Sequence, residues 1–305
     1  MDPDLSRQID LKIDRVNALS IISGYYLVIG GGKIGSKFVE YAEDHGLPFV
    51  LVIDIDCKAP ASKLGKVFED RKDLADILDS LNTDTYLRAS SPPEENRTVQ
   101  NTEIYFFCMD SKDIPSLLGY GIPEYIIPAV PSHAAVDIIA DFVNLDMDAD
   151  LIREVSMDKA DRDRLDVFQS IVSEFPENIV AGTFPEHGAI FLSYARPGEL
   201  CPDNCRGQEN YCYNFKGEKP KTITSYAREI KQGRPGWVFE SRQMGPGIGG
   251  IQGRDLKDNL ISFMKYVNQL ECLPLDADLE NRLPFIATTC NCHGILNLLQ
   301  IGDIS

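Results

Sequence analysis

In the first half of the chain, short uninterrupted apolar runs alternate with segments whose apolar residues have helical spacing. Four apolar runs have the length of buried strands: residues 25–29, 49–53, 103–108 and 125–130. Four segments between or after them have helical spacing: residues 35–45, 74–81, 114–118 and 134–143. This alternation predicts a parallel sheet built from right-handed βαβ units.

The pattern changes near residue 150. A charged stretch over residues 146–166 indicates a passage between two lobes, although charged helical turns at a domain edge would look the same. Beyond it we predict strands within 180–194, a helix over 255–270 and a short helix over 295–299. The glycine-rich residues 245–253 could approach a ligand or form a flexible connection, and we favour the connection.

We therefore expect three parts along the chain. An N-terminal helical segment covers residues 1–21, an α/β domain covers 22–150, and an α+β domain covers 151–305.

Three glycines join the first apolar run to the helix after it. Gly30, Gly32 and Gly35 have the spacing GxGxxG between a strand and a helix, which is the context that a dinucleotide site requires. The first glycine allows a tight turn, the second lets the backbone approach a pyrophosphate, and the third lets the helix pack closely on the sheet. The first-turn amides would face the phosphates, and Lys33 and Ile34 complete this loop. A glycine-rich turn that binds no nucleotide is the alternative.

An acidic residue follows the second strand, where a carboxylate can accept hydrogen bonds from a ribose. Asp54 lies 54 − 30 = 24 positions after Gly30, and Asp56 is the second choice because alternate strand residues face the same side. A carboxylate here repels the extra phosphate of NADP(H), so the sequence favours NAD(H).

The strand–GGGKIG–helix–strand–IDID pattern resembles the NAD(P)-binding Rossmann superfamily, and it is similar to the nucleotide-binding domains of TrkA-type potassium-uptake regulators. The resemblance covers roughly residues 1–130. It implies a Rossmann-like parallel sheet with helices on both faces that binds NAD(H). The matching positions are Gly30, Gly32, Gly35 and Asp54.

Five of the eight cysteines form two groups, which are Cys201, Cys205 and Cys212, and then Cys290 and Cys292 followed by His293. Thiolates bind soft metals, so the first group could wrap one ion or cluster with Cys292 as the fourth ligand. Cys290 or His293 are the alternatives for that fourth position. Both tetrahedral zinc and a [4Fe–4S] cluster accept this set of ligands, so the second domain is expected to carry a cysteine-rich metal site.

Two alternatives to metal binding remain for these cysteines: they are reduced thiols that bind nothing, or they include a redox pair such as Cys201 with Cys205. The remaining cysteines, Cys57, Cys108 and Cys272, stand alone, and we expect single buried thiols rather than a disulfide framework.

Composition limits the classes of partner. The chain has 305 residues, which suffices for two domains with cores, and it is 43% apolar with a net charge of −17. This charge argues against binding to nucleic acid or to an anionic membrane surface. The apolar stretches are too short for a membrane span and the first residues show no signal-peptide pattern, so we expect a cytoplasmic protein.

His133 is the candidate catalytic residue. It follows the apolar run 125–130 and precedes the helical segment 134–143, which places it at a carboxyl end of the expected parallel sheet. It could donate a hydrogen bond to substrate or cofactor, or be an ordinary residue at a helix start.

Together these features favour an NAD-dependent oxidoreductase with a cysteine-ligated metal centre and a small-molecule substrate or effector. A non-enzymatic, TrkA-like regulator that senses NAD(H) or redox state is the first alternative, and an S-adenosylmethionine-dependent transferase is the second. A homo-oligomer is left open.

Overall fold

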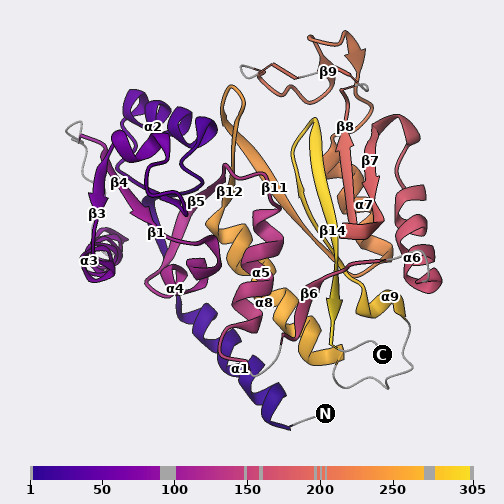
Figure 1. The fold of residues 1–305 in the computed structure, drawn as a ribbon, viewed down its shortest axis with the longest axis horizontal. Helices are drawn as coiled ribbons and strands as arrows, with labels where there is room; N and C mark the ends of the chain where they lie inside the picture. The colour runs from indigo at the N-terminus through magenta and orange to yellow at the C-terminus, as the bar shows by residue number, and fades with distance from the viewer. Residues whose placement is uncertain are drawn as a thin grey trace. The chain divides into compact units, whose positions relative to one another are not determined.

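The computed structural model describes residues 3–89, 101–147, 150–157, 161–195, 198–199, 201–202, 205–270 and 279–302. It is a mixed α/β protein that divides into two compact units (Figure 1). One unit comprises residues 15–141 and 248–258, and the other comprises residues 1–14, 142–247 and 259–305. This division differs from the expected boundary at residue 150, because residues 248–258 pack with the earlier part of the chain.

The unit of residues 15–141 and 248–258 contains a mostly parallel sheet in the order β3-β4-β2-β1-β5-β12. Its parallel strands are β1 (Ile21–Ile29), β2 (Phe49–Asp54), β3 (Lys66–Phe68), β4 (Glu103–Cys108) and β5 (Ile122–Pro128). The added strand β12 (Ile248–Gln252) runs antiparallel to β5. Chain order reverses between β1 and β5, so the sheet has a topological switch point at their carboxyl ends.

The helices here are α1 (Pro3–Ala18), α2 (Lys33–His45), α3 (Arg71–Ala89), α4 (Ile114–Leu118) and α5 (Ala134–Asn144), with short 3-10 turns η1 (Pro60–Lys63) and η2 (Ser111–Asp113). The division between the units falls inside α1 and α5. Helix α2 buries Phe38, Val39 and Ala42, as its apolar spacing predicts. It ends at Gly46, whose left-handed φ of 63° lets its N–H reach the carbonyls of Ala42 and Glu43.

In the other unit the strand order is β11-β13-β14-β8-β7, with β6 paired to β14. Its strands are β6 (Ile152–Glu154), β7 (Val180–Phe184), β8 (Ala189–Ser193), β11 (Gly236–Gly245), β13 (Phe285–Thr289) and β14 (His293–Ile301). A separate hairpin joins β9 (Tyr211–Cys212) to β10 (Gly217–Glu218), and Figure 1 shows it beyond the end of β8.

The helices of this unit are α6 (Arg162–Ser173), α7 (Ile223–Gly233), α9 (Leu279–Arg282), most of α8 (Gly253–Leu270), and the 3-10 turns η3 (Glu177–Ile179) and η4 (Pro185–His187). Helices α6 and α7 and the inner strands share one apolar core that includes Phe168, Ala227, Phe285 and Leu298.

Most strands and helices predicted from the pattern are confirmed, including α4 at residues 114–118 and β4 at 103–108. The short helix predicted over residues 295–299 is wrong, because these residues lie in β14 between β13 and β8. A buried central strand forms a continuous apolar run with no two-residue period. Periodicity alone does not distinguish such a run from a short buried helix.

Two further segments differ from expectation. The glycine-rich residues 245–253 are not a flexible connection, because they end β11, form β12 and begin α8. Gly253 is needed there, since a Cβ would lie 1.8 Å from the carbonyl oxygen of Pro123. The last residues of the charged stretch, 162–166, begin the amphipathic helix α6, which runs from Arg162 to Ser173. Among the described helices, none combines the length and the apolar character needed to cross a membrane.

Candidate functional site

The glycine loop between β1 and α2 lies at the switch point of the parallel sheet. Gly30 has a left-handed φ of 102°, and a Cβ there would lie 2.8 Å from the carbonyl oxygen of Ala129, at the end of β5. Gly35 packs against the same turn, because its Cβ would lie 2.0 Å from the carbonyl oxygen of Gly30. Both positions therefore exclude any larger residue.

Gly32 differs from these two glycines, since a Cβ at this position would meet nothing within 4 Å. Gly32 is also the N-cap of α2 and has no side chain with which to cap the first-turn amides. Lys33 and Ile34 form the first helical turn, with Lys33 exposed and Ile34 half-buried. The unobstructed side of Gly32 thus lies at the start of α2, where no side chain caps the first-turn amides.

The carboxylate of Asp54 ties the second strand to this loop. Its Oδ2 accepts a hydrogen bond from the Gly31 N–H at 2.6 Å, and its Oδ1 accepts one from the Asp56 N–H at 2.8 Å. Asp56 in turn accepts from the Lys58 N–H at 2.9 Å. Each Asp54 oxygen keeps a lone pair, so the carboxylate can still accept from a ligand. Beside it, Ile55 is 72% exposed and offers apolar surface.

Cys57 and Cys108 form a disulfide, so the expectation of single buried thiols is wrong for this pair. Cys108 ends β4, where it lies opposite Asp54 in the parallel register, and Cys57 lies three positions beyond Asp54. The crosslink therefore joins the end of β4 to the turn that follows Asp54 and carries Asp56. Cys272 lies outside the described residues.

His133 lies where the sequence places it, after β5 and immediately before α5, and its carbonyl oxygen accepts from the Val136 and Asp137 N–H groups. Its side chain is 5% exposed and so has little access to solvent. Nearby, Ser132 donates to Asp137, whose pKa is raised by burial. A catalytic role for His133 stays a prediction.

In the other unit, the two cysteine groups come together around a pocket of about 310 Å³. The pocket lining includes Cys205, Cys212, Cys292, Arg206, Asn214 and Lys219. The downstream cysteines belong to the tight turn between β13 and β14, where the Cys290 N–H donates to the His293 carbonyl at 2.8 Å. Asn291 of that turn donates to the Gly207 carbonyl at 2.8 Å, which joins the two groups across 84 positions.

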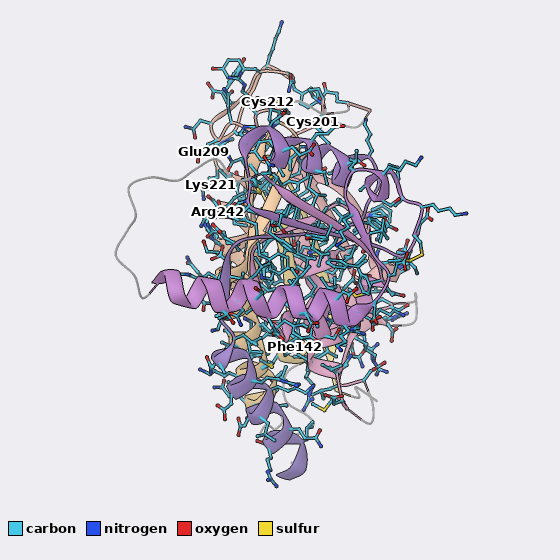
Figure 2. The ribbon with its side chains drawn as sticks, turned by 90° about the vertical axis from the view of Figure 1, so that its left-hand side faces the viewer. Phe142, Cys201, Glu209, Cys212, Lys221 and Arg242 are labelled. Carbon is cyan, nitrogen blue, oxygen red and sulfur yellow. A yellow bond between two sulfur atoms is a disulfide. The ribbon has the colours of Figure 1, made fainter. Side chains whose placement is uncertain are left out.

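The thiol of Cys201 belongs to the same cluster, near Cys212 at one end of this unit (Figure 2). Burial, and next the neighbouring Cys205, raise the pKa of Cys201 to about 12, with smaller contributions from Cys292 and Cys212. Burial also raises the pKa of Cys292, against an opposing effect of Lys219. The pKa of His293 is lowered by burial and then by Lys219.

The thiol cluster is thus assembled, but its side chains do not converge as metal ligands. Within the described part of the chain, no group of three Cys, His, Asp or Glu side chains has the arrangement of a metal site. Metal binding by Cys201, Cys205, Cys212 and Cys292 stays a prediction, and it would require the sulfurs to turn toward a common ion.

Lys219 is a pocket residue that the sequence pattern did not single out. Its side chain is 3% exposed, and its ammonium donates to the Gln208 carbonyl and to Cys292 Sγ, the latter at 3.0 Å. A lone lysine after a hairpin carries no local signal, because its sulfur partner lies 73 positions downstream.

The fold and these two sites define a mixed α/β protein with a glycine loop at a sheet edge in one unit and a thiol pocket in the other. Residues 147–302 match the family model AF_1314_C, described as "Uncharacterized protein, C-terminal domain", and the chain belongs to this family. The matched region contains the thiol pocket and not the glycine loop.

The chain is also similar to a protein of Archaeoglobus fulgidus named "Uncharacterized protein". The two are 25% identical over 275 residues, which cover 90% of this chain and 98% of that protein.

Proposed function

We propose that the protein binds NAD(H) at the glycine loop and acts as an oxidoreductase on a small-molecule substrate. The observation that carries the proposal is the open side of Gly32 at an uncapped helix start, with Gly30 and Gly35 closely packed behind it. This is the division of roles that a dinucleotide loop needs, because only the middle glycine must let a pyrophosphate approach. The strand order β4-β2-β1-β5 corresponds to the 3-2-1-4 order of a Rossmann-like sheet.

The preference for NAD(H) over NADP(H) follows from charge. Asp54 ends β2 and Asp56 follows it, and a 2′-phosphate placed beside these carboxylates would be repelled. The exposed side chain of Ile55 offers apolar surface on which an adenine ring could pack. S-adenosylmethionine fits less well, since it has no pyrophosphate to use the first-turn amides.

Gly32→Ala should separate ligand binding from folding. The added methyl group meets nothing within 4 Å, so the unliganded variant should unfold at the wild-type temperature. The same methyl group would occupy the approach to the loop, so we expect NADH affinity to fall at least about tenfold. Thermal unfolding across a series of NADH concentrations measures both quantities, because a ligand that binds only the folded state raises the transition temperature.

The same titration with NADPH and S-adenosylmethionine ranks the three ligand classes. NADH should stabilise the wild type most. Absence of stabilisation by either nicotinamide cofactor would contradict both the oxidoreductase and the NAD(H)-sensing alternative. NADH binding without turnover of any tested hydroxy or carbonyl compound would favour the sensor, in which the bound nucleotide is the signal.

We also propose that the thiol pocket holds a metal centre, either zinc or a [4Fe–4S] cluster, with Cys201, Cys205, Cys212 and Cys292 as ligands. Support comes from the four thiols gathered from distant segments, with Cys290 and His293 close by as alternative ligands. Soft thiolates select both of these metals. When bound, such a centre would supply structural stability or, as a cluster, electron transfer.

Cys205→Ser should remove the metal and leave the nucleotide site intact, because the two sites lie in different units. Metal analysis of protein purified without oxygen should give metal for the wild type and little for the variant, with equal NADH affinities. A broad visible absorption band would identify the iron–sulfur cluster, and a colourless metal-containing protein would identify zinc. Wild-type protein that contains and binds no metal would contradict the centre.

A further inference from the structure

The strand order assigns the two halves of a dinucleotide to opposite sides of the glycine loop. Asp54 ends β2, the glycine loop follows β1, and residues 129–133 follow β5, so these segments lie in the order β2-β1-β5 along one edge of the sheet. With the adenosine ribose at Asp54 and the pyrophosphate at the glycine loop, the nicotinamide half falls to the end of β5. The side chains at this end of β5 are therefore the ones that would meet the nicotinamide.

The segment after β5 packs directly against the glycine loop. The Ala129 N–H donates to the Ile29 carbonyl at 2.8 Å. A Cβ on Gly30 would lie 2.8 Å from the Ala129 carbonyl oxygen and 2.9 Å from a methyl carbon of Val130. Ser132, which is exposed, follows Val130 by two positions. Ser132 is therefore within two residues of a direct contact with the phosphate-binding turn.

Asp137 supplies a negative charge at this end of β5. It lies in the first turn of α5, and its Oδ2 accepts a hydrogen bond from the Ser132 hydroxyl at 2.9 Å. This bond holds the carboxylate at the segment after β5. Asp137 is only partly exposed, and partial burial strengthens its interaction with a nearby charge because the local dielectric constant is lower. The neighbouring His133 side chain is 5% exposed and is thus less available to a ligand.

Lys112 acts on Asp137 from another segment of the same edge. It lies in η2, which follows β4, and its backbone N–H donates to Asp110 Oδ1 at 3.1 Å. Burial raises the pKa of Asp137, and the Ser132 hydroxyl and then the Lys112 ammonium oppose that rise. The carboxylate and the exposed ammonium have opposite effects on a charge placed beside them, so each can be removed to test the other.

We propose that Asp137 makes the nucleotide site prefer NAD⁺ over NADH. The nicotinamide ring is positively charged only in the oxidised form, so a carboxylate beside it attracts NAD⁺ and has little effect on NADH. This inference rests on the proposed NAD(H) site and does not depend on the metal centre. A site that holds the oxidised cofactor favours a hydroxy compound over a carbonyl compound as substrate.

Asp137→Asn removes the charge and keeps an oxygen that can accept from Ser132. Isothermal titration with NAD⁺ and with NADH, in mildly alkaline buffer in which Asp137 is ionised, gives the ratio of the two Kd values. We expect the affinity for NAD⁺ to fall about five- to tenfold, as for one partly screened charge pair, and the affinity for NADH to change less than about twofold. Asp137→Glu keeps the charge and should retain the preference for NAD⁺, a rescue that a purely structural role would not predict.

Lys112→Met should move the ratio in the opposite direction. Loss of the ammonium removes a repulsion from the oxidised ring, so the affinity for NAD⁺ should rise, by a smaller factor because Lys112 is exposed to solvent. If Asp137→Asn does not fold, this surface variant decides the question in the same titration.

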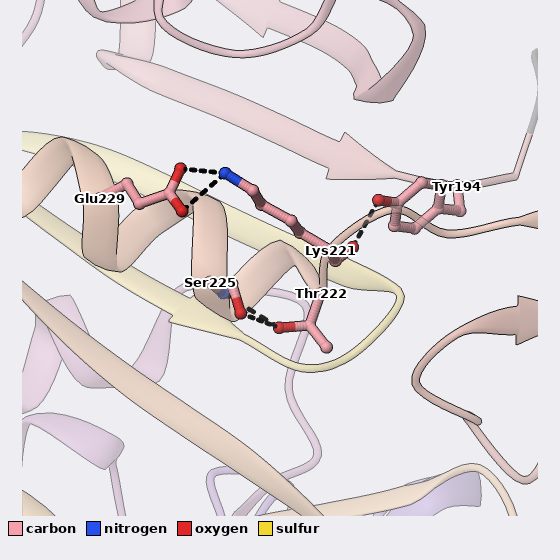
Figure 3. Close-up of polar contacts among 5 residues, drawn as sticks. All are labelled: Tyr194, Lys221, Thr222, Ser225 and Glu229. Carbon is pink, nitrogen blue, oxygen red and sulfur yellow. Dashed lines mark hydrogen bonds and ion pairs between the residues drawn. The ribbon is translucent and has the colours of Figure 1, made fainter.

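Glu229→Gln and Lys221→Met are the controls for the loss of one charge. Lys221 precedes α7 and pairs with Glu229 of that helix at 2.7 Å on the surface of the unit without the glycine loop (Figure 3). Both controls should leave the two affinities unchanged.

A wild type that binds both forms, with the same ratio in the folded variants of Asp137 and Lys112, would overturn the role of Asp137 and leave the NAD(H) site standing. Tighter binding of NADH than of NAD⁺ by the wild type would do the same. A wild type that binds neither form would overturn the nucleotide site itself.

Discussion

Gly35→Ala should both destabilise the unit that contains the glycine loop and abolish detectable NADH binding. The new Cβ would lie 2.0 Å from the Gly30 carbonyl oxygen and 3.3 Å from a methyl group of Val28. A backbone oxygen cannot turn aside as a flexible side chain can, so helix α2 must shift away from β1 or the turn must open. Overpacking of this kind costs about 1–3 kcal/mol, and here the displaced group is the proposed phosphate-binding turn itself.

Urea unfolding followed by circular dichroism measures the loss of stability, and isothermal titration with NADH measures binding. Gly32→Ala is the control, since it adds the same methyl group to the same loop where nothing lies within 4 Å. We expect Gly35→Ala to lose stability and binding together, and Gly32→Ala to lose binding alone. Equal stability of Gly35→Ala and the wild type would show that α2 does not approach β1 as closely as described.

The sequence predicted the elements around the glycine loop because each has a strong local signal. β2 is an uninterrupted apolar run, α2 has apolar residues at helical intervals, and Gly46 ends it. The same local pattern predicted the geometry of the glycine loop, since Gly30 and Gly35 are close-packed as their positions in GxGxxG imply.

Features that depend on partners distant in the sequence were harder to predict from the sequence. Strand β14 was predicted as a helix because its apolar run lacks a period, and only its pairing with β13 and β8 defines it as a strand. The hydrogen bond from Lys219 to Cys292 likewise depends on the β13–β14 turn, which brings that cysteine close. Residues 248–252 look like a linker because glycine has low strand propensity, yet they form β12 by pairing with β5.

The Cys57–Cys108 disulfide could in principle have been predicted from the sequence. Once β2 and β4 are placed as adjacent parallel strands, the register puts Asp54 opposite Cys108. Cys57 then follows within reach, in the turn after β2. The expectation of isolated thiols came from the assumed reducing compartment and not from the strand order, so a correct sheet topology would have corrected it.

Removing the Cys57–Cys108 crosslink should lower the free energy of unfolding of its unit by about 4 kcal/mol. The two cysteines are 51 positions apart, and the chain-entropy relation gives that magnitude for a loop of this length. Urea unfolding of oxidised wild type, reduced wild type and Cys57→Ser/Cys108→Ser measures the change. Reduction should lower the stability of the wild type and leave the double variant unaffected, which separates this crosslink from the thiols of the pocket.

The same three samples test whether the crosslink supports the nucleotide site. Asp54, at the end of β2, accepts a hydrogen bond from the Gly31 N–H with its carboxylate, and its carbonyl accepts one from the Met109 N–H at 2.9 Å. These hydrogen bonds remain after reduction, so the folded loop should persist and NADH affinity should fall only a few-fold, well below the loss expected for Gly35→Ala. Peptide mapping of the oxidised wild type should recover Cys57 and Cys108 in one linked fragment. Recovery of both as free thiols, together with equal unfolding midpoints of the three samples, would contradict the crosslink.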